Sequence, residues 1–180
     1  SSDLGNEDAD WAGLAGVIDA HEVRAERLQD NPGGVESLLP FLSRYECASL
    51  TLDEVMEMPF DGLRFQAAPD GFVIRKATMD DLSLLVALYA DADDMARSPA
   101  AVELPLRERR VWLALKDNVA ISVALTNAES TTMAVIGGVY TAPEWRGHGL
   151  SQAVCSGLCR ELIEMHLQPV LYLHYPPAGH

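Results

Sequence analysis

Residues 139–152, with the sequence VYTAPEWRGHGLSQ, constrain the fold more than any other part of the chain. Apolar residues before Pro143 predict a strand, and Gly147 and Gly149 predict a tight loop after it. From Leu150 onward, apolar residues recur at helical spacing, which predicts an amphipathic helix directly after the loop. The stretch therefore predicts a strand, a glycine loop and a helix in immediate succession.

This loop is suited to bind an anion. The first turn of a helix leaves backbone N–H groups unpaired and carries the positive end of the helix dipole. No Ser, Thr, Asp or Asn directly precedes Leu150 to cap those groups, and glycines let a phosphate approach them closely. We therefore interpret the loop as a candidate phosphate site, with a purely structural tight turn as the alternative.

The composition limits the partners. The 180 residues are 48% hydrophobic, enough for a globular core, and their formal net charge is −14. Such a charge disfavours nucleic acid and anionic membranes, because binding to phosphate-rich surfaces needs Lys and Arg. A cationic partner fits better, although a solvated acidic surface explains the same composition. No apolar run is long enough to span a bilayer and no signal peptide is visible, so we expect a cytoplasmic protein.

The three cysteines do not predict a metal site. Cys155 and Cys159 lie four residues apart on the expected helix, and no second Cys/His pair accompanies them or Cys47. We expect reduced, buried thiols and no bound metal.

Residues 1–68 are predicted to form a helical N-terminal region. Apolar spacing favours helices over residues 8–28 and 35–47, separated by the helix-breaking sequence NPGG. Neither segment contains a catalytic motif. We therefore interpret the region as a helical appendage to the main domain.

The end of this region is expected to be less regular. Thr51 and Glu54 fit a capping box for a short helix that ends before Pro59, and residues 63–67 fit a short strand. A turn at residues 69–71 then marks the predicted boundary with a core of residues 69–180.

The core is predicted to combine helices with a sheet. The expected elements, in order, are a strand at 72–77, a helix at 79–92, strands at 111–115, 119–125 and 132–141, the helix after the glycine loop, and a strand at 170–174. Short connections predict an antiparallel meander for the middle strands. The pair Gly137 and Gly138 favours a bulge in the third of them. The last strand follows a crossover helix, so it should run parallel to the strand before it.

This order of elements, together with the loop, resembles the GNAT N-acetyltransferase superfamily. Residues 146–151, RGHGLS, are similar to that family's acyl-CoA signature, in which Arg or Gln is followed by two residues, Gly, one residue, and Gly or Ala. Ser151 replaces the last Gly or Ala and is small enough for close approach of a phosphate. The resemblance covers about residues 72–174. It implies an α+β or α/β fold with a mixed, mostly antiparallel central sheet flanked by helices.

The resemblance also implies acetyl-CoA as co-substrate and indicates which residues hold it. Backbone N–H groups of the loop would bind the pyrophosphate, and the strand before Pro143 would pair with the pantetheine arm as an added strand does. The cofactor-binding residues are then Val139, Tyr140, Thr141, Arg146, Gly147, His148, Gly149, Leu150, Ser151 and Gln152. A backbone N–H near Val139 would stabilise charge on the thioester oxygen when an amine attacks.

The sequence does not single out a catalytic acid or base. Candidates for the base, by residue type alone, are Glu103, Glu108, Glu144, Asp91, Asp93 and Asp94. Water leading to bulk solvent is the alternative. Tyr140 and Tyr172 are candidate acids, although aromatic residues in strands more often belong to the core. The aspartate cluster lies where family members usually admit the acceptor, so we expect a cationic amine, either a small molecule or a peptide.

Members of the family usually continue after the last strand with a short helix, often bearing a Tyr that protonates the thiolate, and with two further strands. This sequence stops at His180, so we expect an incomplete C-terminal end of the sheet. A non-catalytic acyl-CoA-binding or sensor module of the same fold is therefore the main alternative. A nucleotide-binding loop is disfavoured because no Lys followed by Ser or Thr comes after the glycines. The oligomeric state is left open, with a homodimer among the expected forms.

Overall fold

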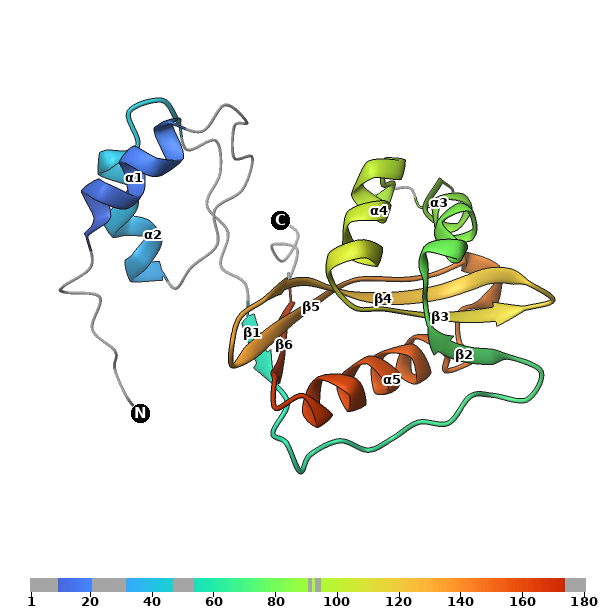
Figure 1. Cartoon of the computed structure of the whole chain (residues 1–180). Helices are drawn as coiled ribbons and strands as arrows, with labels where there is room; N and C mark the ends of the chain where they lie inside the picture. Colours follow the sequence, from blue (N-terminus) through green and yellow to red (C-terminus); the bar gives the residue numbers. More distant parts are fainter. Residues whose placement is uncertain (1–9, 21–31, 47–53, 91, 93–94, 174–180) are drawn as a thin grey trace, which may run out of the picture. The chain divides into compact units, whose positions relative to one another are not determined.

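The computed structural model describes residues 10–20, 32–46, 54–90, 92 and 95–173. Contacts divide the chain into two compact units, Ser1–Leu52 and Asp53–His180. The larger unit thus begins upstream of the expected boundary at residues 69–71, because residues 54–57 already belong to its sheet (Figure 1).

The described part of the N-terminal unit is helical. Its elements are α1 (Trp11–Ala20), α2 (Pro32–Leu38) and the 3-10 turn η2 (Leu39–Phe41). Ala15, Leu38 and Leu42 form a small buried core. The second helix begins earlier than predicted, since a proline is tolerated in the first turn of a helix, and it leaves α geometry before Pro40.

The larger unit contains, within its described residues, a six-stranded sheet with strand order β1-β6-β5-β4-β3-β2. The strands are β1 (Glu54–Glu57), β2 (Val73–Lys76), β3 (Val111–Lys116), β4 (Val119–Glu129), β5 (Met133–Thr141) and β6 (Gln168–Leu173). Neighbouring strands pair antiparallel except β5 and β6, which run parallel. The predicted meander and the parallel last strand are therefore confirmed.

Helices cover both faces of this sheet (Figure 1). Helices α3 (Leu82–Ala90) and α4 (Pro99–Glu108) lie on one face, and α5 (Leu150–Glu164) lies on the other. Neighbouring residues of β3 therefore face opposite sides of the sheet. Leu113 belongs to the buried cluster that includes residues of α3 and α4, and Ala114 belongs to the cluster that includes residues of α5. The expected mixed sheet flanked by helices is thus confirmed. Among the helices in the described ranges, none is both long and apolar enough to cross a membrane.

Two predictions for residues 51–67 are wrong. Residues 54–57, expected in a short helix, form β1 and pair with β6. The edge of a sheet offers a row of backbone partners, which outweighs a weak local helix preference. Residues 63–67, expected as a strand, have no regular secondary structure. They run beside α5, where the N–H of Gln66 donates to Oγ of Ser156 over 3.1 Å.

The start of α3 is tied to β2 by an ion pair. Thr78 is the N-cap of the 3-10 turn η3 (Met79–Asp81), which leads into α3, and its backbone N–H donates to the Asp81 carboxylate over 2.8 Å. The guanidinium of Arg75 donates two further hydrogen bonds of 2.7 Å to the same carboxylate. These bonds hold the pKa of Asp81 below its usual range. Thr78 thus caps the start of the helix that the sequence predicts from residue 79.

Helix α5 packs closely on the sheet at Gly157. A Cβ built at this glycine would lie 2.3 Å from Cε3 of Trp112. The indole N–H of Trp112 donates to Oε2 of Glu161 over 2.7 Å, one turn further along the helix. This contact positions α5, whose N-terminal end carries the glycine loop.

The segment after the last strand lies outside the described residues, which end at Leu173. The expected incompleteness of the C-terminal end therefore stays a prediction.

Candidate functional site

Strand β5 carries a bulge in its C-terminal half. Between the pairs Val123–Tyr140 and Leu125–Gly137, two residues of β5 oppose a single residue of β4. One of the two is Gly138, whose φ of +57° lies in the left-handed region that glycine adopts readily. The bulge predicted from the glycine pair is confirmed, and it bends the backbone locally out of the regular ladder.

Strands β5 and β6 part beside this bulge. Their parallel pairing ends at the pair Ile136–Leu171, although both strands continue. Just after β5, Ala142 donates its N–H to a carbonyl of β4 over 2.9 Å. Because successive residues direct their backbone groups to opposite sides of a strand, those of Thr141 point away from β4. The carbonyl of Thr141 accepts a 3.1 Å hydrogen bond from Nε of Arg146. An edge of β5 thus lies open next to the loop.

The glycine loop exposes the N-terminus of α5. The 3-10 turn η5 (Pro143–Trp145) joins β5 to the loop, in which φ is +80° at Gly147 and +76° at Gly149. Gly149 is the N-cap of α5, and no side chain of the described residues caps this end. A Cβ at Gly147 would meet no described atom within 4 Å, and one at Gly149 would meet only Oε1 of Gln152, at 3.7 Å. Backbone conformation therefore requires these glycines, and the space over the helix end is accessible to an anion.

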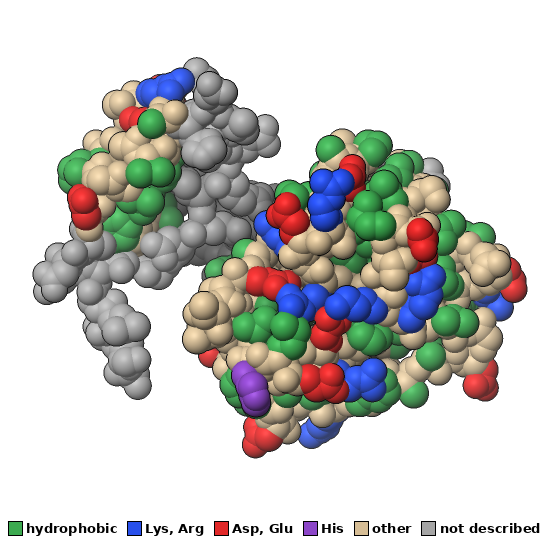
Figure 2. Space-filling model, viewed as in Figure 1, with side chains coloured by type: hydrophobic (Ala, Val, Ile, Leu, Met, Phe, Trp, Pro, Cys, Tyr) green, Lys and Arg blue, Asp and Glu red, His purple; other side chains and the backbone are tan. Residues whose placement is uncertain are grey.

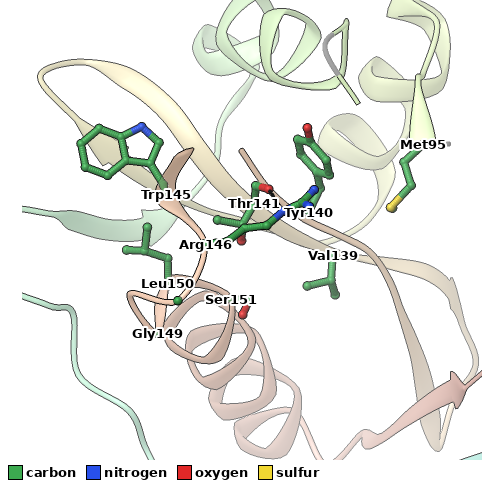
Figure 3. A pocket seen from close by; sticks show the side chains of 10 residues that line it. Met95, Val139, Tyr140, Thr141, Trp145, Arg146, Gly149, Leu150 and Ser151 are labelled. Carbon is green, nitrogen blue, oxygen red and sulfur yellow. Dashed lines mark hydrogen bonds between the residues drawn. The ribbon is translucent and has the colours of Figure 1, made fainter. Parts of the chain in front are cut away.

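A pocket of about 380 Å³ opens between the end of β5 and the start of α5 (Figure 3). Its lining residues are Met95, Val139, Tyr140, Thr141, Trp145, Arg146, Gly147, Gly149, Leu150 and Ser151. In Figure 3, the ring of Tyr140 points to the side of α3 and α4, whereas Val139 points to the side of α5. The structure thus brings eight of the ten residues predicted for acetyl-CoA into one pocket.

The other two predicted residues, His148 and Gln152, lie beside the pocket and are exposed. Nδ1 of His148 lies 3.2 Å from the carbonyl oxygen of Trp145 and 3.1 Å from that of Arg146. The imidazole therefore folds back on its own loop. A role for these two residues through their backbone N–H groups stays a prediction.

The glutamates considered as a general base do not line this pocket. Glu103 forms an ion pair with Arg107, one turn further along α4. Glu108, at the end of α4, and Glu144, in η5, are both exposed. None of the three glutamates lines the pocket.

The remaining candidates divide between described and undescribed residues. Asp91, Asp93 and Asp94 lie outside the described residues. Tyr140 lines the pocket, whereas Tyr172 is half-buried on β6 and does not. Of the two candidate acids, only Tyr140 is therefore found at the pocket, and its role as an acid stays a prediction.

Tyr89, which lies within the predicted helix at residues 79–92, reaches the bulge. It is fully buried on α3, and its hydroxyl donates to the carbonyl of Gly138 over 2.5 Å. Burial raises the pKa of Tyr89 to about 12, although the nearby Arg97 acts in the opposite direction. The phenol therefore stays a hydrogen-bond donor at ordinary pH. Nothing in the sequence around Tyr89 predicts this contact, because a buried tyrosine of a helix usually only packs in the core.

The two cysteines of α5 are free thiols held in their neutral form. Burial raises the pKa of Cys155 to about 11 and, with the neighbouring Cys155, that of Cys159 to about 12. Cys47 lies outside the described residues. Within the described ranges, no group of three His, Cys, Asp or Glu side chains is arranged to hold a metal ion.

The larger unit thus combines a bulged strand, an open strand edge and a glycine loop at a helix N-terminus. The family model described as Acetyltransferase (GNAT) family matches residues 81–178. This match spans more than half of the chain, and the chain belongs to the GNAT acetyltransferase family. Comparison with curated protein sequences finds no match.

Solved structures share the fold at low sequence identity. A putative GNAT acetyltransferase from Novosphingobium aromaticivorans is 19% identical, with a TM-score of 0.54, over 93% of this chain and 69% of that one. A Drosophila protein is 14% identical, with a TM-score of 0.56, over 68% of this chain and 41% of that one. A GCN5-related N-acetyltransferase-like protein from Streptococcus suis is 18% identical, with a TM-score of 0.50, over 68% and 53%. This chain thus spans only about half the length of the last two proteins.

Proposed function

We propose that this chain is an N-acetyltransferase that moves an acetyl group from acetyl-CoA to a primary amine of a small molecule or peptide. The observation that carries the proposal is the pocket where the exposed N-terminus of α5 meets the open edge of β5. Membership of the GNAT acetyltransferase family supports the choice of acetyl donor.

Two parts of the pocket would hold acetyl-CoA. Backbone N–H groups after Gly147 and Gly149 would bind the diphosphate at the helix end, where the dipole favours negative charge. The exposed guanidinium of Arg146 adds a positive charge at the same place. The open backbone of β5 near Thr141 would pair with the pantetheine arm in the manner of an added strand.

The bulge would serve the chemical step. Acetyl-CoA supplies an activated acyl carbon, and negative charge develops on its carbonyl oxygen during attack by the amine. A backbone N–H near Val139, freed from regular pairing by the bulge, would stabilise that charge. Among the described residues no carboxylate lines the pocket, which favours water as the acceptor of the amine's proton; Asp91, Asp93 and Asp94, outside the described residues, are the alternative. Correct positioning of two reactants contributes up to about 7–11 kcal/mol in ideal systems.

A thiol-release assay with acetyl-CoA and a panel of primary amines tests the proposal, alongside calorimetric titration with CoA. We expect CoA to bind and at least one class of amine to release free thiol. Polyamines belong in the panel, because the net charge of −14 favours a cationic acceptor. CoA binding without release on any amine would instead support a non-catalytic acyl-CoA-binding module. Absence of CoA binding would refute both functions.

A further inference from the structure

Arg97 places a guanidinium beside the bulge of β5. Its Cζ lies 5.2 Å from the ring centre of Tyr89, the residue whose hydroxyl donates to the bulge carbonyl. A Cβ built on Gly138 would lie 3.0 Å from a terminal nitrogen of Arg97. Val139, the next residue of β5, and Met95, two residues before Arg97, both line the pocket. The guanidinium therefore lies next to the pocket wall, beside the place where the reaction would occur.

This guanidinium has no ion-pair partner among the residues that the structure describes. It is half-buried, and its contact with the ring of Tyr89 recovers only part of the cost of removing a cation from water. A planar guanidinium in this situation is suited to bind a carboxylate through charge-assisted, bidentate hydrogen bonds.

The charge at the bulge differs from the charge of the whole chain. The pocket is lined by Arg146 and, within the described residues, by no carboxylate, although the net charge of the chain is −14. Figure 2 shows basic side chains lying between acidic ones on one face of the larger unit. Exposed charges more than a Debye length away, about 8 Å at physiological salt, are largely screened. A bound ligand would therefore respond to Arg97 more than to the acidic residues of the described ranges that lie further away; Asp91, Asp93 and Asp94 are outside those ranges.

We propose that Arg97 binds a carboxylate of the acceptor, so that the acceptor is a small molecule bearing both an amine and a carboxylate, as an amino acid does. This inference rests on the proposed acetyltransferase function and makes Arg97 a specificity-determining residue. Its contact would direct the amine of the acceptor toward the bulge. A carboxylate on the acyl group of the donor presents the same chemistry, and the experiment separates these two sources.

The first arm of the experiment uses the full chain, acetyl-CoA and pairs of acceptors that differ only in the carboxylate, namely amino acids and their amides. The ratio of kcat/KM for acid over amide is the readout, because any loss of folded protein cancels within one variant. Arg97→Gln should lower this ratio by about ten- to a hundredfold, mainly through a higher KM for the acid. Arg97→Lys should restore part of it. Arg107→Gln, which replaces an exposed arginine of α4, is the matched control and should leave the ratio unchanged.

The second arm compares acetyl-CoA with succinyl-CoA at one neutral amine. A preference for succinyl-CoA that disappears in Arg97→Gln would assign the carboxylate to the acyl group and overturn the acceptor assignment. Equal ratios for acid over amide in the wild type and in Arg97→Gln would also overturn it, while leaving acetyl transfer intact. Absence of thiol release with every acceptor would refute the underlying acetyltransferase function as well, so the two failures are distinguishable.

Discussion

Gly149 is the position at which one substitution tests the phosphate site most directly. It is the N-cap of α5 with φ of +76°, and a Cβ there would meet only Oε1 of Gln152, at an ordinary contact distance of 3.7 Å. In Gly149→Glu, a carboxylate is therefore placed over the helix N-terminus without a clash. The helix dipole favours this charge, which competes with a phosphate for the same N–H groups.

Two contributions act on these variants, and only the second distinguishes Gly149→Glu from Gly149→Ala. The left-handed backbone costs any non-glycine residue about 1–2 kcal/mol in stability, and this applies to both variants. Only the Glu variant brings a negative charge close to the bound diphosphate. At a separation of about 6 Å and an effective dielectric constant of about 20, one such pair costs about 3 kcal/mol. That free energy corresponds to roughly a hundredfold increase in Kd.

Calorimetric titration with CoA at two salt concentrations measures this effect. Gly149→Ala should bind within about tenfold of the wild type, whereas Gly149→Glu should bind about a hundredfold more weakly, with a smaller deficit at high salt. Gly16→Glu adds the same charge on the exposed surface of α1, where a Cβ meets no described atom within 4 Å, and is the matched control. Unchanged CoA affinity in Gly149→Glu would refute the proposed phosphate site.

Three further predictions concern the framework of the site. Gly157→Ala should lower the free energy of unfolding in urea by about 1–3 kcal/mol, because the clash with Trp112 at 2.3 Å exceeds a helix-propensity gain of about 1 kcal/mol; a stabilised variant would contradict this packing. Tyr89→Phe should lower the free energy of unfolding by about 1–3 kcal/mol, because it leaves the buried carbonyl of the bulge unpaired, and it should reduce kcat more than CoA affinity. An unchanged kcat would show that the bulge has no role in catalysis. The hydrogen bonds from Arg75 lower the pKa of Asp81, so its stabilisation is present above the unfolded value of about 3.8 and is lost as pH falls through the folded pKa. Acid unfolding should therefore be less steep in Asp81→Asn, and identical pH profiles would show that the pair adds no stability.

The local elements around the site could be predicted from the sequence because their determinants are close together in the chain. Apolar periodicity and two glycines predicted the strand, loop and helix over residues 139–152, and the structure has them. The glycine pair at residues 137–138 likewise predicted the bulge, since backbone freedom at a glycine is a local property. The parallel direction of β6 followed from its crossover connection.

Tertiary pairing decided the features that depend on distant segments. Residues 54–57 had a reasonable local helix pattern, yet the edge of β6 made them a strand, because sheet hydrogen bonds come from residues more than a hundred positions away. Tyr89 and Arg97 meet Gly138 only because α3 and the segment after it pack on the sheet. The spacing of residues along the sequence does not predict such contacts between distant segments. The bulge itself was therefore predictable, whereas the side chains that surround it were decided by the packing of the helices on the sheet.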